Sequence, residues 1–301
     1  MTTRDAAGRE TLDPQHPLFG LGYAHSVERR TFTRVRDTDR TTEEAPVAEE
    51  VPVALAYNGK PHVVMMCTPA DIEDFARGFT LTEEIVASAS EIGAIKVVKY
   101  SQGIEVAISI PEARAARLAD RGRALVGRTG CGLCGVTTID DALRPGRHVC
   151  AQADADREGV RDASGFAKLA VDALFAAADK LPAWQIYNDG TNAVHAAAWV
   201  DRAGTIVFAR EDVGRHNALD KLIGAMSVAK LDPRAGFALV TSRASYELVQ
   251  KCAAVGIVAL AAISRPTGLA IRMADAAGIG LAGLVRGRSA NLYAHPELFG
   301  A

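Results

Sequence analysis

The stretch REDVGRHNALDK, residues 210–221, joins an expected strand to an expected helix and is the best guide to the fold of the C-terminal half. Gly214 allows the chain a tight turn, and Arg215 and His216 follow at the start of the helix. The first N–H groups of a helix are free, and the helix dipole favours an anion there. With an arginine and a histidine added, this turn is a candidate phosphate cradle.

The same turn also has a purely structural interpretation. Asn217 is one of the residue types that cap helices, and Asp212 could form a salt bridge with Arg215. Taken alone, the stretch leaves both the phosphate cradle and the ordinary strand-to-helix connection open.

Two further strand-to-helix junctions carry the same residue types. VTSRASYE (240–247) places Ser242 and Arg243 at the end of a strand, and ISRPTGLA (263–270) repeats the serine–arginine pair. Ligands of open parallel sheets bind outside the carboxyl ends of the strands. An arginine with a hydroxyl group or a histidine at three successive strand ends predicts a site for a polyanion, such as a nucleotide or a pyrophosphate. The alternative is that these are ordinary surface arginines.

Strand and helix patterns alternate from residue 193 to the C-terminus, with short linkers between them. Such alternation predicts an α/β domain whose sheet is mostly parallel and is covered by helices on both faces. We place this domain at residues 161–301. Near its end, LVRGRSANLY (284–293) sets Gly287 between two arginines, where the backbone could come close to a ligand. A solvated hairpin with a basic tip is the alternative.

A smaller α/β domain is expected over residues 46–125. Its sequences VPVALAY and HVVMMC predict two strands of a hairpin, because the Asn-Gly dipeptide between them is a strong turn signal. Thr68 and Pro69 then have the residue types of a helix cap and a first helical position. Residues 1–45 are polar with few apolar anchors, so we expect a flexible N-terminal extension.

The bulk composition excludes several classes of protein. Of the 301 residues, 49% are hydrophobic and 23% are charged, which is typical of a globular protein. A formal net charge of -2 gives no indication of nucleic-acid binding. No apolar run approaches the ~20 residues of a membrane-spanning helix, and the charged N-terminus does not resemble a secretory signal. We therefore expect a cytoplasmic protein that binds neither nucleic acid nor membrane.

The five cysteines point to chemistry rather than to disulfides. An odd, sparse set in an intracellular chain argues against a disulfide scaffold. Cys67 and Cys252 lie in apolar stretches, so we expect them to be ordinary buried residues. In contrast, GRTGCGLCGV (127–136) holds Cys131 and Cys134 two residues apart among four glycines.

A Cys-x-x-Cys pair can hold zinc, exchange disulfides or carry sulfur. Structural zinc needs four ligands, and the sequence has no second pair. A thioredoxin-like pair starts a helix, whereas GVTTID after Cys134 is a poor helix start. A sulfur carrier fits better, because the glycines favour the mobile arm that a carrier needs to visit two partners. We treat residues 126–160 as this loop and its linker, with all three chemistries still open.

Several long motifs together resemble one family. They are TGCGLCGV, EDVGRHNALDKLIG, TSRASYELVQKCAAVGI, SRPTGLAI and RGRSANLYAHPE, together with YNGKPHVVMMCTPADIEDFARGF closer to the N-terminus. On these motifs the chain is similar to the formate dehydrogenase accessory sulfurtransferases (the FdhD family) over residues 48–298, in order. The first 45 residues lie outside the resemblance.

The resemblance implies a sulfurtransferase that accepts sulfur from a cysteine desulfurase. The sulfur is passed to molybdenum bis(molybdopterin guanine dinucleotide), or its tungsten counterpart, which is bound as cargo and then inserted into formate dehydrogenase. It also implies a homodimer whose main domain is similar to the cytidine deaminase fold, with a mixed sheet covered by helices. Deaminase catalysis is not expected, because zinc deaminases read His-x-Glu and Ala197 stands in place of that glutamate after His195.

Carried over residue by residue, the resemblance makes Cys131 the persulfide-bearing nucleophile and Cys134 its helper. The family's cofactor-binding segment maps onto Leu284, Val285, Arg286, Gly287, Arg288 and Ser289. The strand-end residues that suit the guanine dinucleotide's diphosphate are Arg215, His216, Ser242 and Arg243. No resident metal is expected. Residues 287–289 read Gly-Arg-Ser where we expect Gly-Gly-Arg in relatives, so the basic group is displaced by one position.

Two other functions compete with this one. A thiol–disulfide oxidoreductase would form a stable Cys131–Cys134 disulfide. A non-catalytic chaperone would bind the nucleotide cofactor and dock onto formate dehydrogenase without needing either cysteine.

Overall fold

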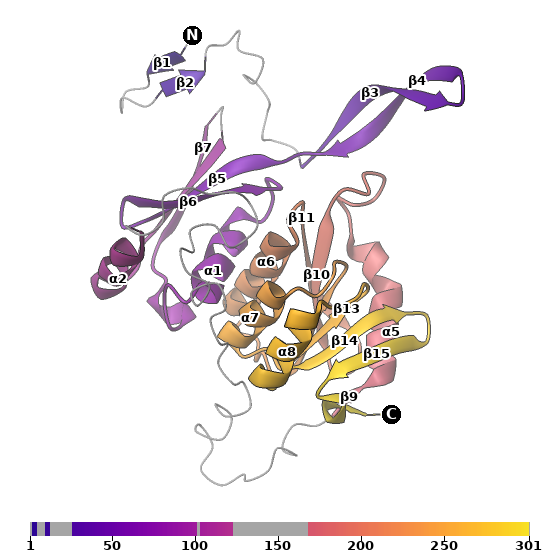
Figure 1. The fold of residues 1–301 in the computed structure, drawn as a ribbon. Helices are drawn as coiled ribbons and strands as arrows, with labels where there is room; N and C mark the ends of the chain where they lie inside the picture. Colours follow the sequence, from indigo (N-terminus) through magenta and orange to yellow (C-terminus); the bar gives the residue numbers. More distant parts are fainter. Residues whose placement is uncertain (1, 5–9, 13–25, 101–102, 123–167, 301) are drawn as a thin grey trace.

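The structure is a computed structural model that describes residues 2–4, 10–12, 26–100, 103–122 and 168–300. Two α/β units lie side by side in it (Figure 1). The mixed α/β architecture agrees with the α/β class predicted from the sequence.

The N-terminal unit is a four-stranded sheet in the order β6-β5-β8-β7. Its elements are β5 (Val51–Tyr57), β6 (Lys60–Cys67), α1 (Ile72–Thr82), β7 (Ile95–Tyr100), β8 (Gly103–Ile108) and α2 (Glu112–Gly122), with a short 3-10 helix at Ala89–Glu91. The predicted hairpin is confirmed, since β5 pairs antiparallel with β6 around Asn58 and Gly59. These two residues have φ values of 48° and 77°, the positive values that make Asn-Gly suited to such a turn.

The C-terminal unit is a six-stranded sheet in the order β11-β10-β12-β13-β14-β15. Its strands are β10 (His195–Asp201), β11 (Ile206–Asp212), β12 (Gly236–Val240), β13 (Ala259–Ala262), β14 (Gly280–Arg286) and β15 (Ser289–Ala294). Only the β12–β13 and β13–β14 pairs of this sheet are parallel, so the expectation of a mostly parallel sheet was wrong. The strands at each end turn back through the tight turns at Gly204 and Gly287, and tight turns join antiparallel strands only.

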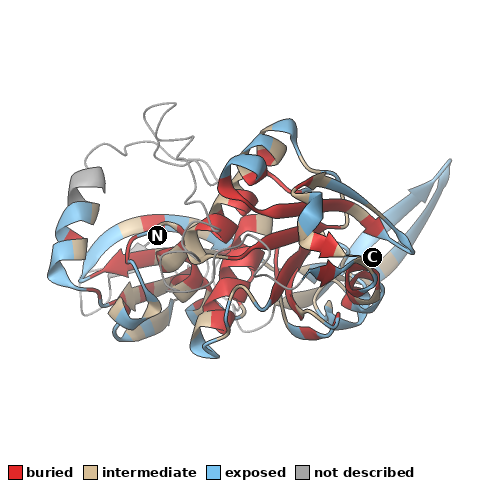
Figure 2. Cartoon of the chain, turned by 90° about the horizontal axis from the view of Figure 1, so that it is seen from below, coloured by how far each residue is buried: buried red, intermediate tan, exposed pale blue. Residues whose placement is uncertain are grey.

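Helices cover both faces of this sheet (Figures 1 and 2). One face carries α6 (Arg215–Val228), α7 (Tyr246–Val255) and α8 (Gly268–Ala277), and the other carries α5 (Val171–Lys180). The remaining short elements are β9 (Leu169–Ala170), β16 (Phe299–Gly300) and 3-10 turns at Leu181–Trp184 and Pro296–Leu298. Alternate residues of each strand therefore enter two separate cores, one under each helix layer.

The N-terminal extension contains strands that the sequence analysis did not assign. β3 (Val27–Arg36) and β4 (Asp39–Ala48) form an antiparallel hairpin, and β1 (Thr2–Arg4) pairs with β2 (Glu10–Leu12). The β3–β4 hairpin projects away from both units with mostly exposed side chains (Figure 2). Its polar composition gave no amphipathic alternation from which strands could be predicted.

The first helix starts later than predicted. α1 begins at Ile72, after Asp71 in a left-handed conformation, rather than at Thr68 and Pro69. Thr68 is buried and bonds to the C-terminal unit instead: its N–H donates to Asp212 Oδ2 at 3.0 Å, and its hydroxyl oxygen accepts from the Val213 N–H at 3.1 Å. Contacts between the two units therefore override the local capping signal.

The two units meet where α1 crosses α6, and their backbones touch there. A Cβ added at Gly78 of α1 would lie 1.7 Å from the Asp220 carbonyl oxygen, and one added at Gly224 of α6 would lie 1.9 Å from the Asp74 carbonyl oxygen. Real Cβ atoms do not come so close to backbone atoms. Glycine is therefore required on both helices at this crossing.

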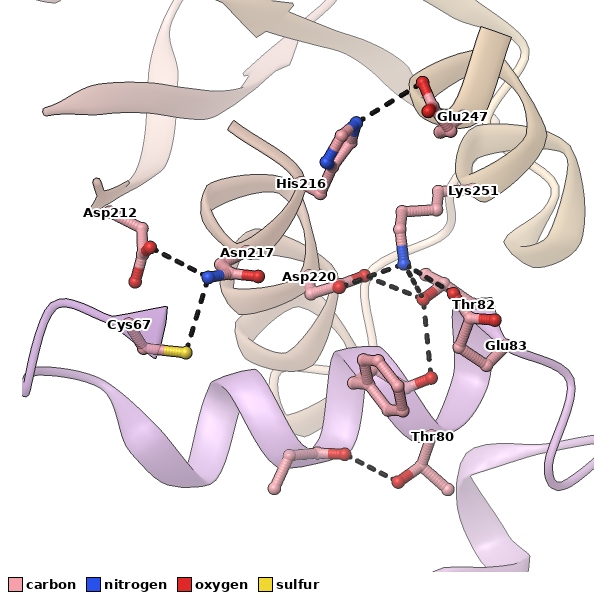
Figure 3. A network of polar contacts seen from close by, with 12 residues as sticks. Cys67, Thr80, Thr82, Glu83, Asp212, His216, Asn217, Asp220, Glu247 and Lys251 are labelled. Carbon is pink, nitrogen blue, oxygen red and sulfur yellow. Dashed lines mark hydrogen bonds and ion pairs between the residues drawn. The ribbon is translucent and has the colours of Figure 1, made fainter. Parts of the chain in front are cut away.

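Buried ion pairs flank the crossing, and Figure 3 shows those of Lys251 with Asp220 and Glu83. Lys221 Nζ lies 2.7 Å from Asp212 Oδ2, and both side chains are fully buried. Lys251 Nζ lies 3.0 Å from both Asp220 Oδ2 and Glu83 Oε1. Because a buried charge is tolerated only when it is paired and hydrogen-bonded, these contacts fix how the two units fit together.

We predict that Gly78→Ala lowers the free energy of unfolding by about 1–3 kcal/mol, as expected for overpacking. Alanine favours a helix more than glycine does, so any loss must come from the crossing with α6. Urea unfolding followed by circular dichroism measures it. The matched control is Gly268→Ala in α8, where the nearest atom to an added Cβ is Arg272 Nη1 at 3.7 Å. Equal stability of the two variants would contradict the backbone contact.

Candidate functional site

The ends of several strands meet at one edge of the six-stranded sheet. His195 begins β10 two residues before Ala197, whose side chain packs in the core under α6–α8. Because side chains alternate along a strand, His195 points to that same face. Ser242 follows β12 and Ser264 follows β13 at this edge, and Ser264 accepts the Leu284 N–H at 3.0 Å through its carbonyl oxygen.

Helix α6 starts at this edge with Arg215, directly after the N-cap residue Gly214. The structural interpretation of this turn predicted that Asn217 caps the helix and that Asp212 pairs with Arg215. Both predictions were wrong. Asn217 does not cap the helix, since its amide donates to Asp212 Oδ1 at 3.0 Å. Asp212 does not pair with Arg215, because its other oxygen is bound by Lys221.

Arg215 has one polar atom without a partner in the part of the chain that the structure describes. Its Nε is buried and has no hydrogen-bond partner among the described residues. A buried donor without a partner costs about 1–3 kcal/mol, which an anion at this edge would offset. This is the observation that best indicates a ligand.

His216 is held by α7 (Figure 3). Its Nε2 lies 3.4 Å from Glu247 Oε2 and 3.5 Å from Ser245 Oγ, and its side chain is 10% exposed. Partial burial opposes ionisation of Glu247, but the contacts with His216 and Ser245 outweigh it and lower the pKa of Glu247 to about 2. The carboxylate thus stays ionised and fixes the imidazole at the site.

His195 lies in a positively charged environment. Burial lowers the pKa of His195, and the charges of Arg215 and His216 lower it further, while Asp212 acts in the opposite direction. Arg215, His216 and His195 are therefore brought together at the sheet edge, although they come from a helix start and a strand start that are 20 residues apart in sequence.

Two other predicted binding residues, Arg243 and Arg286, lie on the surface. Arg243 is exposed next to the buried Ser242, whose hydroxyl donates to the Arg243 carbonyl oxygen at 3.0 Å. Arg286 is exposed beside Gly287, which has a φ of 55° at the β14–β15 turn. Arg243 and Arg286 are thus open to solvent.

The segment that the family resemblance singled out is split between two faces. Arg288 pairs with Asp172 of α5 at 2.9 Å and lies 5.9 Å from the Phe175 ring, while Ser289 is exposed. Val285 is fully buried in the core on the α5 side. Leu284 is the member that reaches the edge near Ser264. Within this segment, Arg288 thus lies against α5, and the backbone of Leu284 bonds to that of Ser264.

Cys131 and Cys134 lie outside the described residues. Cys67 and Cys252 are fully buried free thiols, as the sequence predicted. Burial raises the pKa of Cys67 well above its usual range and raises that of Cys252 to about 12. Since the thiolate is the nucleophile, neither can act as a sulfur acceptor.

The sequence analysis missed Glu247, Lys221 and Lys251, the charged residues that hold this region. A signal was present, because Lys221 stands within the apolar helical run that includes Leu219 and Leu222. A charge inside such a run indicates a buried ion pair. Its partner could not be named without the fold.

The described residues offer neither a cluster of metal ligands nor a membrane-spanning helix. No group of three or more His, Cys, Asp or Glu side chains in the described part of the chain could hold a metal ion. None of the helices that the structure describes is long and apolar enough to cross a bilayer.

Comparison with known proteins decides the family. The FdhD/NarQ family model matches residues 48–299. The chain belongs to the FdhD/NarQ family. Two curated relatives of the family are both named "Sulfur carrier protein FdhD". The one from Bordetella petrii is 49% identical over 256 residues, covering 85% of this chain and 87% of the relative. The one from Xanthomonas euvesicatoria pv. vesicatoria is 48% identical over 270 residues, covering 89% and 90%.

The fold of this FdhD/NarQ family member is also found in a crystal structure. That structure is described as a formate dehydrogenase accessory protein from Desulfotalea psychrophila. It has a TM-score of 0.67 and 21% sequence identity, and the match covers 92% of this chain and 100% of that chain. At this identity the likeness concerns the fold.

We predict that Glu247→Gln removes a contribution to stability that depends on pH. The folded-state pKa of Glu247 is depressed to about 2, so its contribution is present above the unfolded value of about 4.3 and is lost as pH falls toward 2. Urea unfolding at pH 7 and at pH 3 measures it. The loss in E247Q, at most about 3 kcal/mol, should be larger at pH 7 than at pH 3. A loss that is equal at both pH values would contradict the His216–Glu247 contact.

Proposed function

We propose that this protein is a sulfur carrier that serves the maturation of formate dehydrogenase. It takes sulfur from a cysteine desulfurase as a persulfide on Cys131 and transfers it to molybdenum bis(molybdopterin guanine dinucleotide), the cargo, before the cofactor enters formate dehydrogenase. Membership of the FdhD/NarQ family and the names of the curated relatives support the sulfur-carrier part. The description of the similar crystal structure supports the link to formate dehydrogenase.

The observation that carries the cargo part is the buried Nε of Arg215 without a partner. It lies at the sheet edge where His195, His216 and Ser242 also stand. A phosphate oxygen accepts such a donor well, and charge-assisted bonds of this kind are stronger than neutral ones. The two guanine dinucleotides of the cargo each carry a diphosphate, which is the polyanion that this edge fits.

The burial of two other cysteines supports the role of the Cys-x-x-Cys pair. Of the five cysteines, Cys67 and Cys252 are buried with raised pKa values. The nucleophile must then come from Cys131, Cys134 or Cys150. The first two form the only Cys-x-x-Cys pair of the sequence.

The proposed reaction consists of two sulfur transfers and the reduction of a disulfide. The Cys131 thiolate attacks the terminal sulfur of the desulfurase persulfide, the donor's S–S bond breaks, and the donor cysteine leaves as a thiolate. In the second step the Cys134 thiolate attacks Cys131, releasing the terminal sulfur as hydrosulfide to the metal of the cargo. The Cys131–Cys134 disulfide that forms is reduced by a cellular dithiol.

The remaining parts of the proposal follow the family resemblance. We infer from this resemblance that the C-terminal unit, with its antiparallel β10–β11 hairpin and its parallel strands β12–β14, is cytidine deaminase-like. The protein acts as a cytoplasmic homodimer. Leu284 and Arg286 contact the cargo from the strand-end side.

Replacing each cysteine tests the carrier chemistry. We predict that Cys131→Ala abolishes formate dehydrogenase activity in a strain that lacks this protein, because no acceptor thiolate remains. Mass spectrometry after incubation with a desulfurase and cysteine should find one added sulfur on Cys131 in the unmodified protein. The matched control is Cys252→Ala, which removes a thiol that cannot ionise. Full activity of C131A would favour the chaperone. A Cys131–Cys134 disulfide that forms before any sulfur donor is added, with no sulfur gained by Cys131 or by C134A after the desulfurase reaction, would favour the oxidoreductase.

Binding of guanosine diphosphate tests the anion edge. We predict that Arg215→Ala weakens this binding about tenfold or more, since a hydrogen bond to a charged group contributes about 1.5–3 kcal/mol. Isothermal titration calorimetry measures it. Arg234→Ala is the matched control, because Arg234 pairs with Asp232 at the opposite edge of the sheet, just before β12. Unchanged affinity in R215A would overturn the assignment.

A further inference from the structure

We propose that His195 is a further binding residue of this anion site, and that one of its ring nitrogens takes up a proton from solvent when a diphosphate binds there. The inference rests on the proposed function for its ligand. It adds a residue outside both the predicted cofactor segment and the arginine-bearing junctions.

The position of His195 puts its ring at the strand-end edge. It is the first residue of β10 and is paired in register with Asp212, the last residue of β11. The next residue, Ala196, is tied to β12, because its N–H donates to Thr241 Oγ1 at 2.9 Å. His195 is thus held between the ends of two neighbouring strands, on the face where α6 begins.

Three charged groups act on the pKa of His195. Arg215 and His216 come from α6, and Asp212 comes from β11, the strand paired with β10. Asp212 is engaged by Lys221 at 2.7 Å, and Glu247 of α7 is turned to His216 at 3.4 Å. The carboxylates are therefore occupied, and His195 experiences mainly the positive charge of its neighbours.

This arrangement disfavours the charged form of the imidazole while the site is free. Burial lowers the pKa of His195, and the positive neighbours Arg215 and His216 lower it further. A diphosphate placed against Arg215 brings a larger negative charge and reverses the sign of the local field. The protonated form of His195 is then favoured, and its N–H becomes a charged donor to a phosphate oxygen.

The consequence is a link between binding and pH. The pKa of His195 is below its usual value in the free protein and is raised by the bound anion. Affinity therefore increases as pH falls through the bound-state pKa and levels off below the free-state pKa. Each unit of rise is worth about tenfold in affinity.

The experiment is calorimetric titration with guanosine diphosphate between pH 5.5 and 8.5, on the unmodified protein and on His195→Gln. Glutamine keeps a donor and an acceptor but cannot take a charge. The terminal phosphate of the probe titrates near pH 6 and affects both proteins alike, so the difference between their curves reports His195. We expect the unmodified protein to bind about fivefold to tenfold more tightly than H195Q at pH 5.5 and about equally at pH 8.5.

His295→Gln is the matched control. His295 follows β15 at the opposite edge of the sheet, where its Nδ1 pairs with Glu297 at 2.8 Å. H295Q should keep the pH dependence of the unmodified protein. Binding by H195Q that follows the unmodified curve at every pH overturns the role of His195 and leaves the anion site in place. Absence of binding by the unmodified protein at every pH overturns the anion site, and this inference with it.

A second measurement does not depend on the stability of the variant. Ring-labelled histidine in the unmodified protein gives one NMR titration curve per histidine, and His195 is assigned by the signal lost in H195Q or in His195→Asn. Its pKa should lie below about 6.5 without guanosine diphosphate and at least one unit higher with it. An unchanged pKa overturns the proton uptake.

Discussion

The contact between α1 and α6 is the constraint on which the rest of the structure depends. Gly78 and Gly224 let the two backbones touch, and this brings the N-terminal unit against the first turns of α6. Lys251 then bridges Asp220 of α6 and Glu83 at the end of α1. The buried charges fix the register, since a shift by one residue would leave a lysine or an aspartate buried without its partner.

This contact also prepares the candidate site. Thr68 enters from the N-terminal unit, donates its N–H to Asp212, and accepts Lys221 Nζ through its carbonyl oxygen at 2.9 Å. Asp212 is thereby used up in holding the two units together and is not available to neutralise Arg215. The N-terminal unit thus acts on the surroundings of Arg215 through Asp212, the carboxylate that lies nearest to it along the chain.

Much of the fold could be predicted from the sequence, and the exceptions have physical causes. The Asn-Gly turn and the apolar faces of the helices are local signals, so β5–β6 and α6–α8 were expected where they are found. The late start of α1 was not, because the bonds of Thr68 to Asp212 connect residues 144 apart and override a local cap. The strand-end edge was predicted from a rule on parallel sheets, whereas the His216–Glu247 contact needed the relative placement of two helices. The contact of Arg288 with Asp172 of α5 could not be predicted either, since it depends on a helix layer that a motif does not encode.

The balance of charge at the strand ends gives the strongest argument for an anionic ligand. Every acidic group near this edge that the structure describes already has its own partner. Glu211 accepts the N–H groups of Tyr187 and Asn188 at 2.9 Å each, Asp212 is bound by Lys221, and Glu247 faces His216. Arg215 has no such balance, because its buried Nε finds no acceptor among the described residues. A folded protein retains an unsatisfied buried donor only at a cost. A ligand that supplies both the acceptor and the negative charge removes that cost, and a diphosphate supplies both at once.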